Sequence, residues 1–106
     1  MTWSRPAWPW NRHWKIRTTV PSVHDIPDKI RRRTAVLVQS NTYPKWLVFD
    51  CPCVERHRVM INLDPHNRPF WTVLAPSPLT VVPSVDQKKG ATRCHYIIRA
   101  GRIGWV

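Results

Sequence analysis

The sequence predicts a mainly β protein: a small single-domain β-sheet or barrel-like fold of about six or seven short strands, with an extended N-terminal tail. Eleven prolines and only three glycines argue against long helices and favour short strands joined by stiff turns. Short runs of β-branched and aromatic residues recur between these turns. We therefore divide the chain into a basic Trp/Pro-rich tail, residues 1–22, and a β-rich Cys/His domain, residues 23–106.

The individual strands follow from side-chain alternation and turn chemistry. His57–Leu63 alternates polar and apolar residues, which places its apolar side chains on one face of a sheet. Val85–Ala91 is rich in polar residues and is expected to be a charged loop. The other expected strands are Thr34–Gln39, Lys45–Asp50, Phe70–Leu74, Leu79–Val82, Arg93–Arg99 and Arg102–Val106, the last two forming a hairpin that turns at Ala100-Gly101.

The tail combines tryptophan with basic residues. This composition suits a membrane interface or a groove on a partner protein. The alternative is a tail whose tryptophans pack back on the domain. The residues concerned are Trp3, Trp8, Trp10 and Trp14, interleaved with Arg5, Arg12, Lys15 and Arg17.

The net charge of +11 points to an acidic partner, either a protein surface, an anionic membrane or a nucleic acid. Nucleic acid is the least favoured of these, because the basic residues are dispersed and only Arg31–Arg33 form a compact cluster. No apolar run is long enough to span a bilayer. An odd number of cysteines fits a reducing, cytoplasmic location better than a disulfide framework.

Three cysteines lie close to histidines in two short segments, Cys51–His57 and Cys94-His95. If the cysteines meet in the fold, they form a zinc site of three thiolates, with His57 or His95 as the fourth ligand. Zinc would also help so small a core to fold. The expected metal ligands are Cys51, Cys53, Cys94 and His57. The plainer alternative is that the cysteines are small buried apolar residues.

The second chemistry open to these residues is nucleophilic catalysis by Cys94. A thiol needs a base or a positive field to become a thiolate. His95 is adjacent to Cys94, so on a strand it would face the opposite side and serve poorly as a base. His57 or His66, supplied by another segment, is the better candidate. The expected catalytic residues are accordingly Cys94, His95 and His57.

From about Val23 onward, the chain resembles a family of small bacterial and phage domains. Their pattern is Cys-Pro-Cys-Gly-Cys, Asn-Leu, Arg-Pro-x-Trp, Thr-Leu-x-Pro-Ser-Val, Cys-x-Ser-His-Phe and Arg-x-Gly-Arg-Val-x-Trp. Some members are linked to bacterial ubiquitin-like conjugation operons. The matching segments here are Trp46–Asp50, Cys51-Pro-Cys53, His57–Leu63, Arg68–Trp71, Leu79–Val85, Cys94–Tyr96 and Arg99–Trp105.

The chain departs from the pattern at three positions. Glu55 and Thr92 stand where the family has cysteines, and Cys94 stands where it has the serine of Cys-x-Ser-His. One interpretation is that the metal site has eroded while a hydrolytic site persists with cysteine as nucleophile. The other is that a metal-binding cysteine has moved two residues along its strand and still faces the same side.

The resemblance implies a peptidase-like component, deconjugating or processing, of a bacterial ubiquitin-like modification system. Cys94 is then the candidate nucleophile, and a ubiquitin-like protein or its conjugates are the candidate partners. The alternatives are a non-enzymatic zinc-binding module that docks on a protein and, less favoured, a nucleic-acid-binding protein. Whether the protein is an enzyme stays open at this point.

Overall fold

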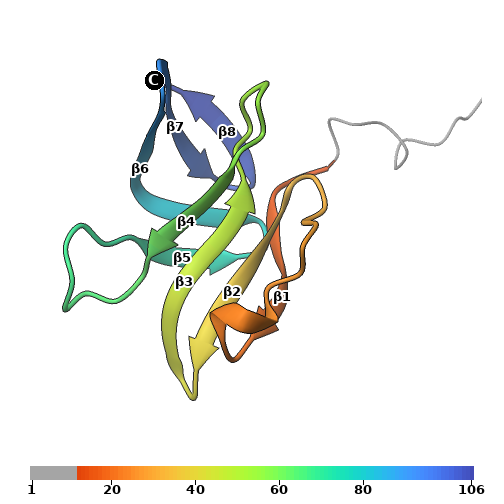
Figure 1. The fold of residues 1–106 in the computed structure, drawn as a ribbon, viewed down its shortest axis with the longest axis vertical. Helices are drawn as coiled ribbons and strands as arrows, with labels where there is room; N and C mark the ends of the chain where they lie inside the picture. Colours follow the sequence, from red (N-terminus) through yellow and green to blue (C-terminus); the bar gives the residue numbers. More distant parts are fainter. Residues whose placement is uncertain (1–11) are drawn as a thin grey trace, which may run out of the picture.

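A computed structural model describes residues 12–106 of the chain. The strands form two four-stranded sheets, ordered β1-β2-β3-β4 and β5-β6-β7-β8 (Figure 1). All neighbouring strands are antiparallel except β1 and β2, which are parallel. The strands are β1 (Lys15–Val20), β2 (Thr34–Ser40), β3 (Tyr43–Asp50), β4 (Arg58–Asn62), β5 (Thr72–Pro76), β6 (Leu79–Lys89), β7 (Thr92–Arg99) and β8 (Arg102–Trp105), and a short 3-10 helix, η2, covers Val23–Asp25.

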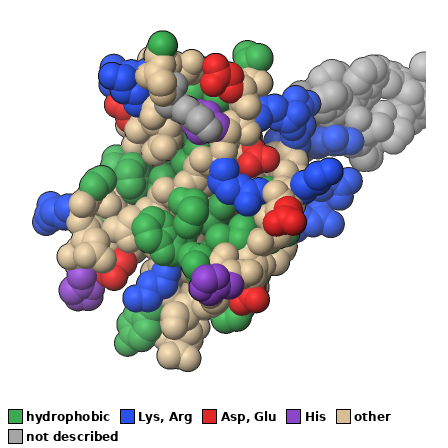
Figure 2. Space-filling view, in the orientation of Figure 1, with side chains coloured by type: hydrophobic (Ala, Val, Ile, Leu, Met, Phe, Trp, Pro, Cys, Tyr) green, Lys and Arg blue, Asp and Glu red, His purple; other side chains and the backbone are tan. Residues whose placement is uncertain are grey.

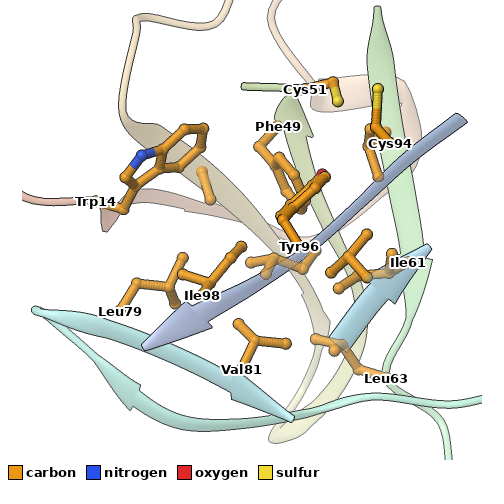
Figure 3. Packing of buried hydrophobic residues seen from close by; sticks show 14 residues of the cluster. Trp14, Phe49, Cys51, Ile61, Leu63, Leu79, Val81, Cys94, Tyr96 and Ile98 are labelled. Atoms are coloured by element: carbon orange, nitrogen blue, oxygen red, sulfur yellow. The ribbon is translucent and has the colours of Figure 1, made fainter. Parts of the chain in front are cut away.

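The main core lies between the two sheets and is built by alternation along each strand. Leu47 and Phe49 of β3 face it from the first sheet, and Cys94, Tyr96 and Ile98 of β7 face it from the second. Figure 3 shows Phe49, Cys94, Tyr96 and Ile98 converging between the strands. Because side chains alternate across a strand, the residues between them in β7 point to the outer face of the second sheet.

The first sheet is covered on its outer face as well. Val36 and Val38 of β2 and Val48 of β3 pack there with Ile30 of the segment that connects β1 to β2. The central residues of β2 and β3 are therefore buried on both faces of the sheet, and this is why the sequences of these two strands are continuous apolar runs.

The hairpin between β7 and β8 turns at Ala100-Gly101, as the sequence predicts. Both residues have positive φ, 51° and 76°, the combination that favours glycine in a two-residue hairpin turn. A Cβ on Gly101 would lie 2.4 Å from the Cβ of His13. Glycine is therefore required here for close approach as well as for its backbone angles.

The prediction of a mainly β fold is confirmed, with two differences in its elements. Lys15–Val20, which fell within the expected tail, forms β1 beside β2. Val85–Ala91, expected to be a loop, largely continues β6, which pairs with β7 as far as Lys89. Trp14 is buried against Phe49, with ring centroids 5.8 Å apart at an edge-to-face angle, whereas Trp3, Trp8 and Trp10 lie outside the described residues.

Within residues 12–106, no helix is both long and apolar enough to cross a membrane.

Candidate functional site

The three cysteines meet at one end of the core. Cys51 follows β3, Cys53 lies in the next turn, and Cys94 is on β7. Their sulfur atoms all lie within 4.8 Å of one another. All three are free thiols, with Cys51 and Cys94 buried and Cys53 half-buried. In Figure 3 the sulfurs of Cys51 and Cys94 lie side by side beyond the ring of Tyr96.

The thiols differ in acidity because they differ in burial and in hydrogen bonding. Burial, and to a smaller degree the two neighbouring thiols, raise the pKa of Cys94 to about 12. Burial also raises the pKa of Cys51. At Cys53 burial acts in the same direction, but hydrogen bonds from the other two thiols and from the backbone lower the pKa overall. In the metal-free protein Cys94 is therefore a protonated thiol with 4% of its surface exposed.

The cysteine cluster has the donor set and spacing of a metal site. Three thiolates around a tetrahedral zinc, each about 2.3 Å from it, would lie roughly 3.8 Å apart, which is compatible with the separations here. His57 Nδ1 lies 3.6 Å from Cys53 Sγ. Two buried polar atoms near the cluster, His57 Nε2 and the Tyr96 hydroxyl, lack a hydrogen-bond partner, and unpartnered buried polar atoms are uncommon in folded proteins. Cysteine and imidazole ligands together fit zinc.

Glu55 and Thr92, which stand where the family patterns have cysteines, lie side by side. The Thr92 hydroxyl donates to Glu55 Oε1 at 3.1 Å. Cysteines at both positions would therefore be neighbours close to Cys53 and Cys94. In this chain the two positions are joined by the Thr92–Glu55 hydrogen bond, and the cluster consists of Cys51, Cys53 and Cys94.

His95 lies on the opposite face of β7 from Cys94. Cys94 and Tyr96 face the core, while His95 is half-buried on the outer face. The structure therefore does not bring Cys94 and His95 together. His57 lies beside Cys53, and the His66 ring contacts Asp64 in an exposed loop at 2.9 Å.

The partner of His95 is a serine that the sequence analysis did not single out. Ser84 Oγ lies 2.9 Å from His95 Nε2, and both side chains are half-buried. The β6–β7 ladder is irregular between Val81 and Val85, and such irregularities re-aim side chains near functional sites. Ser84 occurs in the matched segment Leu79–Val85, but only the β6–β7 register shows that it meets His95.

Two further contacts fix the backbone of this pair. The Trp71 indole Nε1 donates to the carbonyl oxygen of Ser84 at 3.1 Å. The backbone N–H of Val106 donates to the carbonyl oxygen of His95 at 3.0 Å. Ser84 and His95 are thus held from both sides of the β6–β7 pair, by the segment before β5 and by the end of β8.

Asp86 lies opposite His95 in the β-ladder, but its carboxylate is bound elsewhere. Arg93 donates to both carboxylate oxygens, at 2.9 and 2.6 Å. These hydrogen bonds, and the nearby charge of His95 to a smaller degree, lower the pKa of Asp86. Among residues 12–106, no carboxylate is hydrogen-bonded to the His95 ring, so the described geometry is that of a Ser–His dyad.

A protein-family model described as "Bacterial ubiquitination-like system serine protease (BubE)" matches residues 23–106. The match covers both the cysteine cluster and the Ser84–His95 pair. No curated protein and no solved structure matches the chain.

Proposed function

The chain belongs to the BubE family of bacterial ubiquitination-like system serine proteases, and from this premise we propose that it is a hydrolase with Ser84 as nucleophile and His95 as general base. The observation that carries the proposal is the 2.9 Å contact between Ser84 Oγ and His95 Nε2. A serine hydroxyl is a weak nucleophile until an adjacent base accepts its proton.

The reaction follows from this geometry. Ser84 Oγ attacks the scissile carbonyl carbon while its proton passes to His95 Nε2. The tetrahedral intermediate collapses as the protonated imidazole gives that proton to the leaving amine, which leaves an acyl group on Ser84. A water molecule then loses a proton to His95 and attacks the acyl carbon. Collapse of this second intermediate returns the proton to Ser84 and releases the carboxylic acid.

The proposed substrate is an acyl bond made by a ubiquitin-like protein, either to a target amine or to a peptide that is trimmed from its own C-terminus. The family description, which names a ubiquitination-like system, supports this substrate class. Cys94 is not required in this scheme, because its side chain is buried and lies on the other face of β7 from His95.

A fluorophosphonate probe, which forms a covalent bond with activated serines, tests the assignment without knowledge of the substrate. We expect labelling of the wild-type protein at Ser84, identified by mass spectrometry of peptides. Labelling should fall by at least about 10³-fold in Ser84→Ala and His95→Gln. It should persist in Cys94→Ala that remains folded by circular dichroism.

Ser77→Ala is the matched control, because Ser77 Oγ also lies near a histidine, 3.4 Å from His13 Nε2, but at an exposed site. Its labelling should equal that of the wild type. Undiminished labelling in folded Ser84→Ala would reject Ser84 as the nucleophile, and loss of labelling only in Cys94→Ala would return the role to Cys94.

We further propose that Cys51, Cys53 and Cys94 hold a zinc ion with His57 as the fourth ligand. The clustering of the three sulfurs and the 3.6 Å contact between His57 Nδ1 and Cys53 Sγ support this assignment. His57 itself lies outside the group of ligand atoms that are all within 4.8 Å of one another. A bound zinc would supply cross-linking between β3, the turn after it and β7, which is a structural role. The dyad stands on the opposite face of β7, so the proposed chemistry there does not involve the metal.

A further inference from the structure

An open groove of about 900 Å³ runs beside the cysteine cluster, and arginines dominate its rim. Its lining includes a single carboxylate, Asp50, which lies 3.7 Å from Arg58 outside the groove. Figure 2 shows basic side chains gathered on the right of the molecule. The arginines that line the groove are Arg12, Arg31, Arg32, Arg33, Arg56 and Arg102.

The fold, and not the sequence order, concentrates this charge. Arg12 precedes β1, Arg31–Arg33 precede β2, Arg56 follows β3 and Arg102 begins β8. Within the described residues, none of the six makes a salt bridge. A concave surface lined by charge of one sign concentrates the electrostatic potential and attracts groups of opposite charge.

The groove also contains the free edge of a sheet. β8 is the last strand of the order β5-β6-β7-β8, and its Ile103 and Trp105 line the groove. The Val106 N–H donates to His95 on β7, and antiparallel hydrogen bonds alternate from residue to residue. The backbone N–H and C=O groups of Ile103 and Trp105 consequently point away from β7, on the edge of the sheet that has no further strand among the described residues.

We propose that this groove binds an acidic polypeptide segment in extended conformation, as a strand added to β8. The backbone groups of Ile103 and Trp105 would pair with the segment, and the arginines would bind its carboxylates. Apolar side chains of the segment would pack on Trp105, which is 58% exposed. A nucleic acid would satisfy the arginines but has no backbone N–H and C=O pattern to match a strand edge. This partner site goes beyond the proposed hydrolysis and does not depend on it.

The test uses the full-length Ser84→Ala protein, so that binding is measured whether or not the protein is a hydrolase. The probe is a fluorescein-labelled peptide of alternating glutamate and valine, eight residues long, followed by fluorescence anisotropy. We expect saturable binding that weakens as salt is raised. Reversing two groove charges, Arg31→Glu with Arg32→Glu, should raise Kd by at least about tenfold.

The matched control carries the same change in charge outside the groove, Arg17→Glu with Arg68→Glu, and should alter Kd by less than about threefold. A second peptide with the same sequence and every backbone amide N-methylated has no N–H group on either edge with which to pair with β8, and it should bind at least about tenfold more weakly. Equal binding by the Arg31/Arg32 variant, equal binding of the methylated peptide, or tighter binding of a twelve-nucleotide single-stranded DNA would each overturn the proposal.

Discussion

At the scale of single residues, two neighbouring positions of β7 face different surroundings, for which we propose different chemistries. Cys94 faces the core and the other two thiols, whereas the next residue, His95, faces outward and meets Ser84. A cysteine–histidine pair that is adjacent in sequence is thereby divided between a metal-type cluster and a dyad. This division follows from the two-residue period of a strand alone.

Trp71 is a positioning residue for the proposed nucleophile, since its indole N–H holds the carbonyl of Ser84. We predict that Trp71→Phe keeps the aromatic packing but loosens Ser84 against His95. The kcat for a cleavable substrate, or the fluorophosphonate labelling rate, should fall roughly tenfold while KM changes little. Stability to urea should fall by about 1 kcal/mol or less.

Trp46→Phe is the control for that measurement, because Trp46 packs on the outer face of the first sheet. It should leave kcat unchanged. If Trp71→Phe has wild-type kcat, or if it raises KM with no effect on kcat, then Trp71 does not position Ser84.

The meeting of the three cysteines could be predicted from the sequence, but the contact between Ser84 and His95 could not. Cysteine and histidine are few and chemically distinctive, so their convergence is a natural expectation. Serine is common, and only the β6–β7 register shows that Ser84 lies beside His95. That register is interrupted between Val81 and Val85, so regular alternation would not have located Ser84 beside His95.

At the scale of structural elements, the segment between β4 and β5 depends on one amide side chain. Asn62 Nδ2 donates to the carbonyls of Asp64, Asn67 and Pro69 at 3.0–3.1 Å, and the Trp71 N–H donates to the Asn62 carbonyl at 2.8 Å. The network fixes the backbone of Trp71, whose indole N–H donates to the carbonyl oxygen of Ser84.

We predict that Asn62→Ala lowers the free energy of unfolding by about 1–3 kcal/mol, because three backbone carbonyls lose the two N–H donors that they share. The labelling rate of Ser84 should fall with it, since Trp71 would be less firmly held. Urea unfolding and probe labelling measure the two effects. The control is Asn67→Ala, which removes only an exposed 3.4 Å contact with Asp64 and should change neither the free energy of unfolding nor the labelling rate. Unaltered stability in Asn62→Ala would contradict the role given to this network.

Strands were predictable where one face is buried and adjacent strands pair. β4 shows clear alternation, and the hairpin at Ala100-Gly101 carries its own turn signal. β1 was not predictable in the same way, because it is largely exposed and pairs in parallel with a strand more than ten residues away along the chain. The polar end of β6 is a strand because it pairs with β7, although its own composition is typical of a loop.

At the scale of the whole molecule, the two sheets meet in a core of modest size, and the cysteine cluster closes one end of it. We predict that the purified protein holds about one zinc per chain and that removing it with a chelator lowers Tm by more than about 10 °C. Elemental mass spectrometry and thermal unfolding give the two values. Cys53→Ser should lose the metal and show the lower Tm without chelator.

Thr92→Val is the control, because it breaks the hydrogen bond with Glu55 without removing a proposed ligand. It should retain zinc. A wild-type protein that is metal-free and whose Tm is insensitive to chelator would exclude the structural zinc site, while leaving the Ser84–His95 dyad to be judged by its own labelling experiment.

The net charge of +11 was evident from composition, but its distribution was not. In the sequence only Arg31–Arg33 form a run, so the charge looked dispersed. The fold brings Arg12, Arg56 and Arg102 to the same groove. Long-range placement of this kind depends on the arrangement of the two sheets, which no local pattern specifies.

The alternation along β7 also constrains how this protein family can change over evolutionary time. Thr92 and Cys94 point to the same side of the strand, and His95 points to the other. A metal-binding cysteine can drift along β7 only by an even number of positions, since an odd displacement would carry it out of the interior and onto the surface that bears the dyad. Two lineages can thus hold their cysteines at different positions of the strand while sharing one interior and one surface for the proposed hydrolysis.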